Sequence, residues 1–192
     1  MNRNIRTELK LTIYNNLSLY KALLYLKYPL FKAYNPPFRD VLVCSIQRSG
    51  STLLFNMVSS ILLEYRNQQN TFFINIDDYN KIFQSELSLL VRKTHVYMPV
   101  LAQRIKEKKT IAFFSHRDIR DIVTSALQKG MIKNFDEWIE KGALHVMVNN
   151  ALLYKKLDGV CFISYAELLQ NPLMVAKRIQ EVMDIDVDLS KT

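Results

Sequence analysis

The sequence predicts an α/β domain of three layers, in which a mainly parallel sheet of about five strands lies between two layers of helices. Short apolar runs rich in β-branched residues, typical of strands buried on both faces, recur along the chain. Most are followed by a longer segment whose apolar residues return with the period of a helix. With 192 residues, 49% of them hydrophobic, we expect a single domain over 1–192 with a substantial core. Within it, 1–38 would form an N-terminal helical segment and 41–185 the core.

The N-terminal segment has the pattern of a surface helix rather than of a membrane span. Its most apolar part, Leu17 to Leu26, is interrupted by Ser18 and Lys21 and is too broken for a transmembrane helix or a secretory signal. One interpretation is an amphipathic helix that covers the sheet; the other is a basic, tyrosine-rich helix that contacts a membrane or a partner. Asn35-Pro36-Pro37 would end it. The cytoplasm is the location expected by default.

The first strand, Val41 to Ile46, leads into a loop with the composition of an anion-binding site. Between this strand and the helix that follows lie a cation, a glycine and three hydroxyl groups, supplied by Arg48, Ser49, Gly50, Ser51 and Thr52. Backbone N–H groups at the helix start can converge with these side chains on one phosphate or sulfate. An ordinary turn needs only one such hydroxyl, as the N-cap. Because no lysine follows Gly50, the pattern GxxxxGK[ST] of ATP and GTP hydrolases is not present.

A second predicted strand, Leu87 to Thr94, ends in the triplet Lys93-Thr94-His95. Ligand groups in open α/β sheets gather at the carboxyl ends of strands. If the strand continues to His95, then Lys93 and His95 point to the same side, where a cation and a base can meet one substrate. A lone histidine is more often a capping or solvent-exposed residue, and that alternative stays open.

A third strand, Ile111 to Ser115, is followed at its end by Arg117 and then by a helix with an apolar stripe. Arg117 suits phosphate binding because its guanidinium group reaches two oxygens at once. Ser125 follows eight residues later, about two turns into the helix. The charged residues between them, Asp118, Arg120 and Asp121, are expected to cap the helix and to form a surface ion pair.

The remaining segments complete the predicted domain. They are a strand at Thr71 to Ile76 followed by Asp77-Asp78, a short helix at Asn80 to Ser85, a helix ending near Lys108, a long helix at Phe135 to Tyr154 broken near Gly142, a strand at Val160 to Ser164 and a helix at Leu173 to Met183.

Four segments together resemble the PAPS-dependent sulfotransferase family, whose members use 3′-phosphoadenosine 5′-phosphosulfate (PAPS). The loop QRSGSTLL resembles the family's 5′-phosphosulfate loop, and the Lys93 to His95 triplet resembles the strand end that carries the catalytic histidine. Arg117 with Ser125 resembles the R-x(7)-S element that binds the 3′-phosphate. Tyr165 and the residues after it resemble the step Y-E-D-L-x-x-x-P. The chain is thus similar to a compact, bacterial-type member over roughly residues 41–185.

The resemblance implies a P-loop-like sulfotransferase fold and the transfer of a sulfonate group from PAPS to a hydroxyl or amine. The acceptor would be a small molecule, a glycan or a lipid. His95 would be the general base, with Lys93 and Arg48 at the transferring group, and no metal is required. The cofactor would be held by residues Arg48 to Thr52 together with Arg117, Ser125 and Tyr165. For Tyr165, lining the adenine and packing a strand exit remain equal alternatives.

The sequence departs from the family pattern at three points. Arg48 stands where a lysine is usual, and Leu53 where many members have an aromatic residue that stacks on adenine. The segment R-K-G-x-x-G-x-W, which clamps the cofactor in many relatives, is not found. Another element would then close the pocket, or the nucleotide site is more open, or activity is lost.

The composition fits an anionic cofactor. The net charge of +8 suits such a partner, and the scattered positive charges form no nucleic-acid-binding signature. Cys44 and Cys161 fall in predicted strands and are expected as core residues, and the three histidines lack metal-ligand spacing. Two other functions stay open. One is a P-loop-like small-molecule kinase with Mg²⁺ held by Asp77 or Asp78, and the other is a module that binds nucleotide or sulfate without catalysis.

Overall fold

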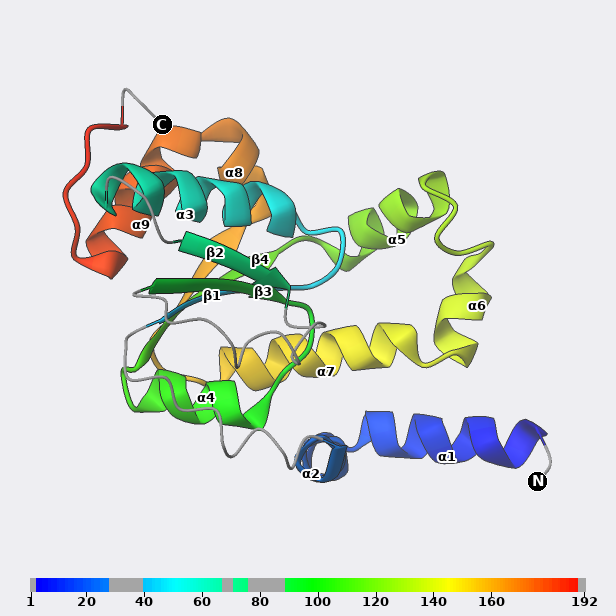
Figure 1. Ribbon diagram of the computed structural model, residues 1–192. Helices are drawn as coiled ribbons and strands as arrows, with labels where there is room; N and C mark the ends of the chain where they lie inside the picture. Colours follow the sequence, from blue (N-terminus) through cyan, green and yellow to red (C-terminus); the bar gives the residue numbers. More distant parts are fainter. Residues whose placement is uncertain (1–2, 28–39, 67–70, 76–88, 190–192) are drawn as a thin grey trace.

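A computed structural model describes residues 3–27, 40–66, 71–75 and 89–189 (Figure 1). The strands are β1 (Asp40–Ser45), β2 (Thr71–Asn75), β3 (Leu89–Thr94), β4 (Thr110–His116) and β5 (Val160–Ser164). The helices are α1 (Arg3–Asn15), α2 (Leu17–Lys27), α3 (Ser51–Arg66), α4 (Pro99–Lys106), α5 (Ile119–Gln128), α6 (Phe135–Glu140), α7 (Ala143–Lys155), α8 (Tyr165–Gln170) and α9 (Pro172–Met183). The short helix predicted at Asn80 to Ser85 lies outside the described residues.

The five strands form one sheet in the order β2-β3-β1-β4-β5, and every neighbouring pair is parallel. The predicted α/β architecture with a parallel sheet of about five strands is therefore confirmed. Because all strands run the same way, their carboxyl ends meet at one edge. β1 is central, with Cys44 opposite Thr94 of β3 and Ser45 opposite Ser115 of β4. The segments that follow these three strands are neighbours for this reason.

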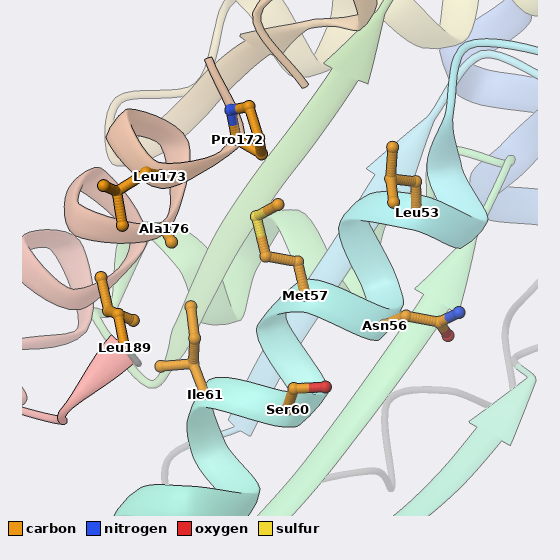
Figure 2. A pocket seen from close by; sticks show the side chains of 9 residues that line it. All are labelled: Leu53, Asn56, Met57, Ser60, Ile61, Pro172, Leu173, Ala176 and Leu189. Carbon is orange, nitrogen blue, oxygen red and sulfur yellow. The ribbon is translucent and has the colours of Figure 1, made fainter. Parts of the chain in front are cut away.

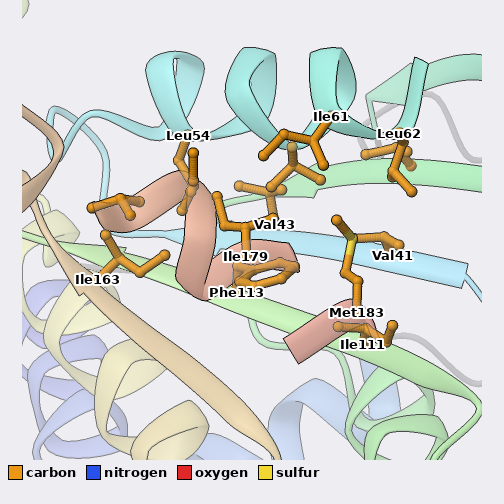
Figure 3. Packing of buried hydrophobic residues seen from close by; sticks show 14 of the residues in the cluster. Val41, Val43, Leu54, Ile61, Leu62, Ile111, Phe113, Ile163, Ile179 and Met183 are labelled. Atoms are coloured by element: carbon orange, nitrogen blue, oxygen red, sulfur yellow. The ribbon is translucent and has the colours of Figure 1, made fainter. Parts of the chain in front are cut away.

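Helices cover both faces of the sheet, and alternate residues of β1 point to opposite faces (Figure 1). Val41 and Val43 pack with residues of α3 and α9, as Figure 3 shows. Leu42 and Cys44 pack on the other face, with residues of α2, α4 and α7. All six residues of β1 are buried, which explains the apolar run from Val41 to Cys44 between Asp40 and Ser45. Cys44 is a buried core residue with a free thiol, as expected.

The N-terminal helices lie against the α4 and α7 side of the domain. Tyr20 and Leu24 of α2, one turn apart, are buried in the core on that side. Leu19 and Leu26 remain 45% and 77% exposed. One face of α2 therefore covers the domain, and the other is open to a partner. No helix among the described residues is long and apolar enough to cross a membrane. The predicted turn at Asn35-Pro36-Pro37 lies outside those residues.

A buried charged cluster, which no sequence pattern indicates, forms around Asp40 at the start of β1. Asp40 of β1 forms salt bridges with Arg92 of β3 and with Arg104 of α4. Thr110 of β4 donates a hydrogen bond to the same carboxylate. Asp40 and Arg92 are 0% exposed and Arg104 is 3% exposed. Buried charges persist only when they are paired, so Asp40 compensates two guanidinium groups and ties α4 to the sheet.

The long helix predicted over residues 135–154 is divided, as expected, near Gly142. α6 ends at Glu140 and α7 begins at Ala143. Gly142 has φ 69°, and a Cβ atom there would collide with the ring of Tyr14 in α1. Only glycine combines this backbone conformation with so close an approach. The break sets the direction of α7, which runs beneath the carboxyl edge of the sheet.

Candidate functional site

The loop between β1 and α3 contains two residues with left-handed backbone. Arg48 has φ 65° and Gly50 has φ 83°. A Cβ atom on Gly50 would lie 2.6 Å from Cδ2 of Tyr165, so only glycine fits beneath this ring. Ser49 is fully buried, and its Oγ donates to the carbonyl of Ser115 in β4 at 2.9 Å. The Ser49 side chain therefore holds the loop in place, while Arg48 and the following residues remain for a ligand.

The start of α3 supplies backbone donors. The N–H of Leu54 bonds to the carbonyl of Gly50 at 3.0 Å. The N–H groups of Ser51, Thr52 and Leu53 precede that bond, and a helix leaves such groups without an intrahelical partner. They carry the partial positive charge of the helix end. The predicted anion-binding loop therefore has the backbone geometry that its composition indicated.

Lys93 joins the helix start from the neighbouring strand. Its Nζ donates to Oγ1 of Thr52 at 2.9 Å. Burial lowers the pKa of the Lys93 ammonium group, because the charged form loses contact with water. An anion beside Lys93 would offset that loss. The first and second sequence motifs therefore meet at one point.

His95 follows β3 directly, because β3 ends at Thr94 as predicted, so the alternation of side chains along a strand does not extend from Lys93 to His95. Its Nδ1 lies 2.8 Å from Oγ and 3.3 Å from the backbone oxygen of Ser45. A carbonyl oxygen can only accept, so this pair of contacts favours a proton on Nδ1. In that tautomer the ring's lone pair is on Nε2, which is the form a general base needs.

Arg48 reaches across to the third motif. Its Nε and Nη2 donate to Oγ of Ser125 in α5 at 3.2 and 3.0 Å. Arg48, expected at the 5′-phosphosulfate, and Ser125, expected at the 3′-phosphate, are thus in direct contact.

Arg117 is held between a ring and a carboxylate at the end of β4. Its Cζ lies 4.5 Å from the ring centroid of Tyr165, within the range of a cation–π interaction. Its Nε lies 3.4 Å from Oδ2 of Asp121. Tyr165 therefore packs against both Gly50 and Arg117. These contacts are those of a tyrosine that packs at the exit of a strand, which is one of the two roles expected for it. These contacts also place Tyr165 beside the predicted cofactor residues.

The charged residues at the start of α5 have the roles expected of them. Asp118 is the N-cap, accepts from the backbone N–H of Arg120 at 2.9 Å and forms an ion pair with its side chain at 2.7 Å. Hydrogen bonds from Arg120 lower the pKa of Asp118 to about 2. Both side chains are well exposed, so this pair belongs to the surface.

A cavity of about 370 Å³ opens beside the first turns of α3 (Figure 2). Leu53, Met57 and Ile61 line it from α3, and Pro172, Leu173 and Ala176 from α9. Most of these side chains are apolar. Leu53, which stands where the family has an aromatic residue, is at the end of this cavity nearest the loop (Figure 2).

Several residues of the site were not found from the sequence. Ser45 ends a strand as an ordinary small residue, and its contact with His95 depends on strand pairing. Asn150 of α7 is 3% exposed and donates to the backbone oxygen of His95. A buried asparagine inside an apolar helix was the available signal. Asp77 and Asp78, the candidates for Mg²⁺, lie outside the described residues. Among the residues described, no group of three His, Cys, Asp or Glu side chains is placed to hold a metal ion.

Comparisons with known proteins agree with this fold. A mouse sulfotransferase in complex with adenosine 3′,5′-bisphosphate (PAP) superimposes with a TM-score of 0.65 at 14% identity, over 85% of this chain and 65% of that one. Retinol dehydratase with androsterone and PAP gives 0.54 at 15%, over 83% and 64%. The same enzyme with retinol and PAP gives 0.57 at 17%, over 84% and 66%. The chain thus spans slightly less than two thirds of these proteins. A search of curated protein sequences finds no match.

At such low sequence identity, the structural similarity shows only that the fold is shared. The family itself is shown by the sequence, because the family model described as the sulfotransferase domain matches residues 38–191. That range contains the loop, the three strand ends and Tyr165. The chain belongs to the sulfotransferase domain family.

Proposed function

We propose that this protein transfers a sulfonate group from PAPS to a hydroxyl or amine acceptor. The observation that carries the proposal is that three groups lie at the same edge of the sheet. These are the loop cation Arg48, the Lys93 ammonium at the start of α3, and His95 held by Ser45. Two cations and a positioned base suit the transfer of an anionic group to an acceptor that must lose a proton.

The donors fit the sulfonate and 5′-phosphate end of PAPS. The N–H groups at the start of α3, the Arg48 guanidinium and the Lys93 ammonium are all positive or partly positive. Gly50 keeps the loop open, because a Cβ atom there would displace Tyr165. PAPS, when bound, supplies an activated sulfonate and a phosphate leaving group. No metal ligand set is needed for this charge balance, since cations of the chain itself can neutralise the phosphate.

The 3′-phosphate would bind at Arg117 and Ser125. Ser125 already accepts two hydrogen bonds from Arg48, so a phosphate there would lie beside two guanidinium groups. The adenine would lie near Tyr165 and Leu53, at the loop end of the cavity in Figure 2. A leucine offers apolar contact where an aromatic ring offers stacking, so we expect the adenine to contribute less affinity than the phosphates.

The chemical step follows from these positions. The acceptor oxygen or nitrogen forms a bond to sulfur as the bond from sulfur to the 5′-phosphate oxygen breaks. Nε2 of His95 takes the acceptor's proton, while Ser45 holds the opposite ring nitrogen. Arg48 and Lys93 neutralise the charge that develops on the leaving phosphate. Positioning of His95 therefore bears on the transfer step and little on cofactor binding.

The acceptor is proposed as a small-molecule alcohol or amine first, with glycans and lipids as further candidates. Two of the similar structures contain an apolar alcohol, androsterone or retinol, and this supports including such compounds in a panel. The cytoplasmic location and contact of the N-terminal segment with a membrane stay predictions from the sequence.

A titration followed by a transfer assay tests the function. Isothermal calorimetry would compare adenosine 3′,5′-bisphosphate (PAP), which PAPS leaves behind, with ATP and Mg²⁺. Transfer of ³⁵S from labelled PAPS to the acceptor panel would follow. We expect PAP to bind more tightly and His95→Ala to abolish transfer while PAP binding stays largely intact. Preference for ATP with Mg²⁺ would indicate a kinase. PAP binding without transfer to any acceptor would indicate a binding module, and normal transfer by His95→Ala would refute the base assignment.

A further inference from the structure

We propose that Asn150 of α7 is a positioning residue for His95, and that the N-terminal helix α2 completes this arrangement through Tyr20. The inference rests on the proposed function, in which His95 is the base. It gives the N-terminal segment a part in the reaction that neither the sequence pattern nor the family match assigns.

The amide of Asn150 bridges the backbone on both sides of Val96. Its Nδ2 donates to the carbonyl of His95 at 3.2 Å, and its Oδ1 accepts from the N–H of Tyr97 at 3.0 Å. β3 has ended at Thr94, so these groups lie beyond the sheet's hydrogen-bonding ladder. A carbonyl can only accept and an N–H can only donate, which fixes the orientation of the amide.

A second side chain of α7 holds the same turn. The hydroxyl of Tyr154 donates to the carbonyl of Val96 at 3.1 Å. Asn150 and Tyr154 are four residues apart, on one face of the helix. Three consecutive backbone positions after β3 are thus bonded to α7. The turn that carries His95 is therefore held by this helix as well as by Thr94 at the end of β3, whose Oγ1 accepts from the N–H of Val96 at 3.1 Å.

Tyr20 connects the arrangement to α2. Its hydroxyl donates to Oδ1 of Asn150 at 2.9 Å, so that oxygen accepts from both Tyr20 and Tyr97. Tyr20, Tyr97 and Asn150 are each 3% exposed, and Tyr154 is 1% exposed. A buried amide that loses one of its partners cannot turn to water instead. The position of α2 therefore affects the hydrogen bonding of the turn.

His95 is consequently fixed from two sides, by Ser45 at its ring and by Asn150 at its main chain. A base displaced by about 1 Å loses on the order of a hundredfold in rate, because proton transfer needs close contact. In the proposed function the cofactor groups are held by other parts of the chain, namely the β1–α3 loop, Lys93, Arg117 and Ser125 of α5. We therefore expect loss of Asn150 to affect the transfer step and to spare PAP binding.

The chain offers a matched control in Asn149, the preceding residue of the same helix. Asn149 is also buried, at 8% exposure, and its side-chain amide also bonds to an N-terminal helix, at the carbonyl of Tyr14. Among the described residues, the Asn149 side chain makes no hydrogen bond to the His95 turn, whereas that of Asn150 makes two. Asn149→Ala removes a similar buried amide and a similar link to the N-terminal segment. It differs in leaving the His95 turn intact.

Three variants test the proposal beside this control. Asn150→Ala removes all its bonds, Asn150→Asp keeps the acceptor but loses the donor to His95, and Tyr20→Phe removes only the hydroxyl. In the full chain we expect Asn150→Ala to lower kcat about 10- to 100-fold, with the Kd of PAP within about twofold. Tyr20→Phe should change kcat in the same direction by a smaller factor. Asn149→Ala should leave kcat near that of the unchanged protein.

A second readout does not depend on activity. In protein labelled with ¹⁵N-histidine, the ring signals of His95 are identified by their loss in His95→Gln. We expect these signals and their pH titration to change in the Asn150 variants and to stay unchanged in Asn149→Ala. If Asn150→Ala does not fold, Asn150→Asp and Tyr20→Phe carry the test. Equal spectra and equal kcat in the Asn150 and Asn149 variants would overturn the proposal. Absence of transfer to every acceptor would count against the proposed function, while the histidine spectra would still decide the role of Asn150.

Discussion

Arg48 and Ser125 are joined by two hydrogen bonds although they come from different ends of the predicted cofactor site. The guanidinium donates from Nε at 3.2 Å and from Nη2 at 3.0 Å to one hydroxyl oxygen. The side chain of the 5′ loop is therefore aimed at the element expected to bind the 3′-phosphate. A bound bisphosphate would take over these donors, so Arg48 is the residue on which PAP affinity should depend most.

Replacement of Arg48 tests this dependence. Hydrogen bonds to charged groups contribute about 1.5–3 kcal/mol each, so Arg48→Ala should weaken PAP binding about 10- to 100-fold. Arg48→Lys should recover only part of the loss, because lysine lacks the forked donors. Calorimetric titration with PAP measures both. Arg48→Gly is the control for the backbone, since φ 65° suits glycine. It should bind as weakly as Arg48→Ala without unfolding more easily. Unchanged affinity in Arg48→Ala would contradict the proposed site.

Gly50 should not tolerate a side chain. A Cβ atom there would lie 2.6 Å from Tyr165 and 3.2 Å from Leu168, on a backbone with φ 83°. We expect Gly50→Ala to lower the free energy of unfolding by about 1–3 kcal/mol and to weaken PAP binding as Tyr165 moves.

The control for that change is Gly130→Ala. Gly130 has φ 64°, but apart from its chain neighbours no described residue has an atom within 4 Å of its Cβ position. Gly130→Ala carries the backbone strain alone, so urea unfolding should show a smaller loss of stability than in Gly50→Ala, and PAP affinity should be unchanged. Equal effects of the two substitutions would show that the contact with Tyr165 is unimportant.

The rate should depend on pH through Lys93. Burial lowers the pKa of this lysine, so in the free protein its charge is lost at a lower pH than that of an ordinary lysine. Because the charged form is the one that binds an anion, kcat/KM for PAPS should fall on the alkaline side as Lys93 loses its proton. Lys93→Arg keeps its charge to higher pH and should move this decline upward. Measurement of kcat/KM between pH 6 and about 10.5 compares the two proteins. Coincident alkaline limbs would exclude Lys93 as the titrating group.

Asp40 should be essential for stability and irrelevant to the chemistry. Asp40→Asn leaves the buried guanidinium groups of Arg92 and Arg104 without their shared carboxylate. Removal of one partner from a buried ion pair costs about 3–5 kcal/mol, and we expect a loss of that size in urea unfolding. The double variant Asp40→Asn, Arg92→Met should recover part of it, because one of the two buried charges is then removed. PAP affinity of folded Asp40→Asn should not change, since Asp40 starts β1 and the proposed cofactor loop follows the other end of that strand.

The strand order could be expected from the sequence only in outline. Buried strands can be recognised in a sequence as apolar runs, and β1, β4 and β5 lie within one residue of their predicted bounds. β3 contains Arg92, which interrupts its apolar pattern, and it ends at Thr94 as predicted, while its predicted start at Leu87 lies outside the described residues. The helix break at Gly142 was visible because glycine is rare in this chain. That glycine is required there because Tyr14 packs on it, which no local pattern reveals.

The sequence by itself determined the chemistry available to this protein. A cation, a glycine and hydroxyl groups after one strand, a lysine and histidine after another, and an arginine after a third are local facts. In a parallel sheet they must gather at one edge. The tertiary structure decided which of them touch. Ser45 meets His95 through the pairing of β1 with β3, Arg48 turns toward Ser125, and Asn150 holds the His95 turn from a helix 55 positions away. Such contacts depend on packing between distant segments, and no local pattern along the chain shows which residues will form them.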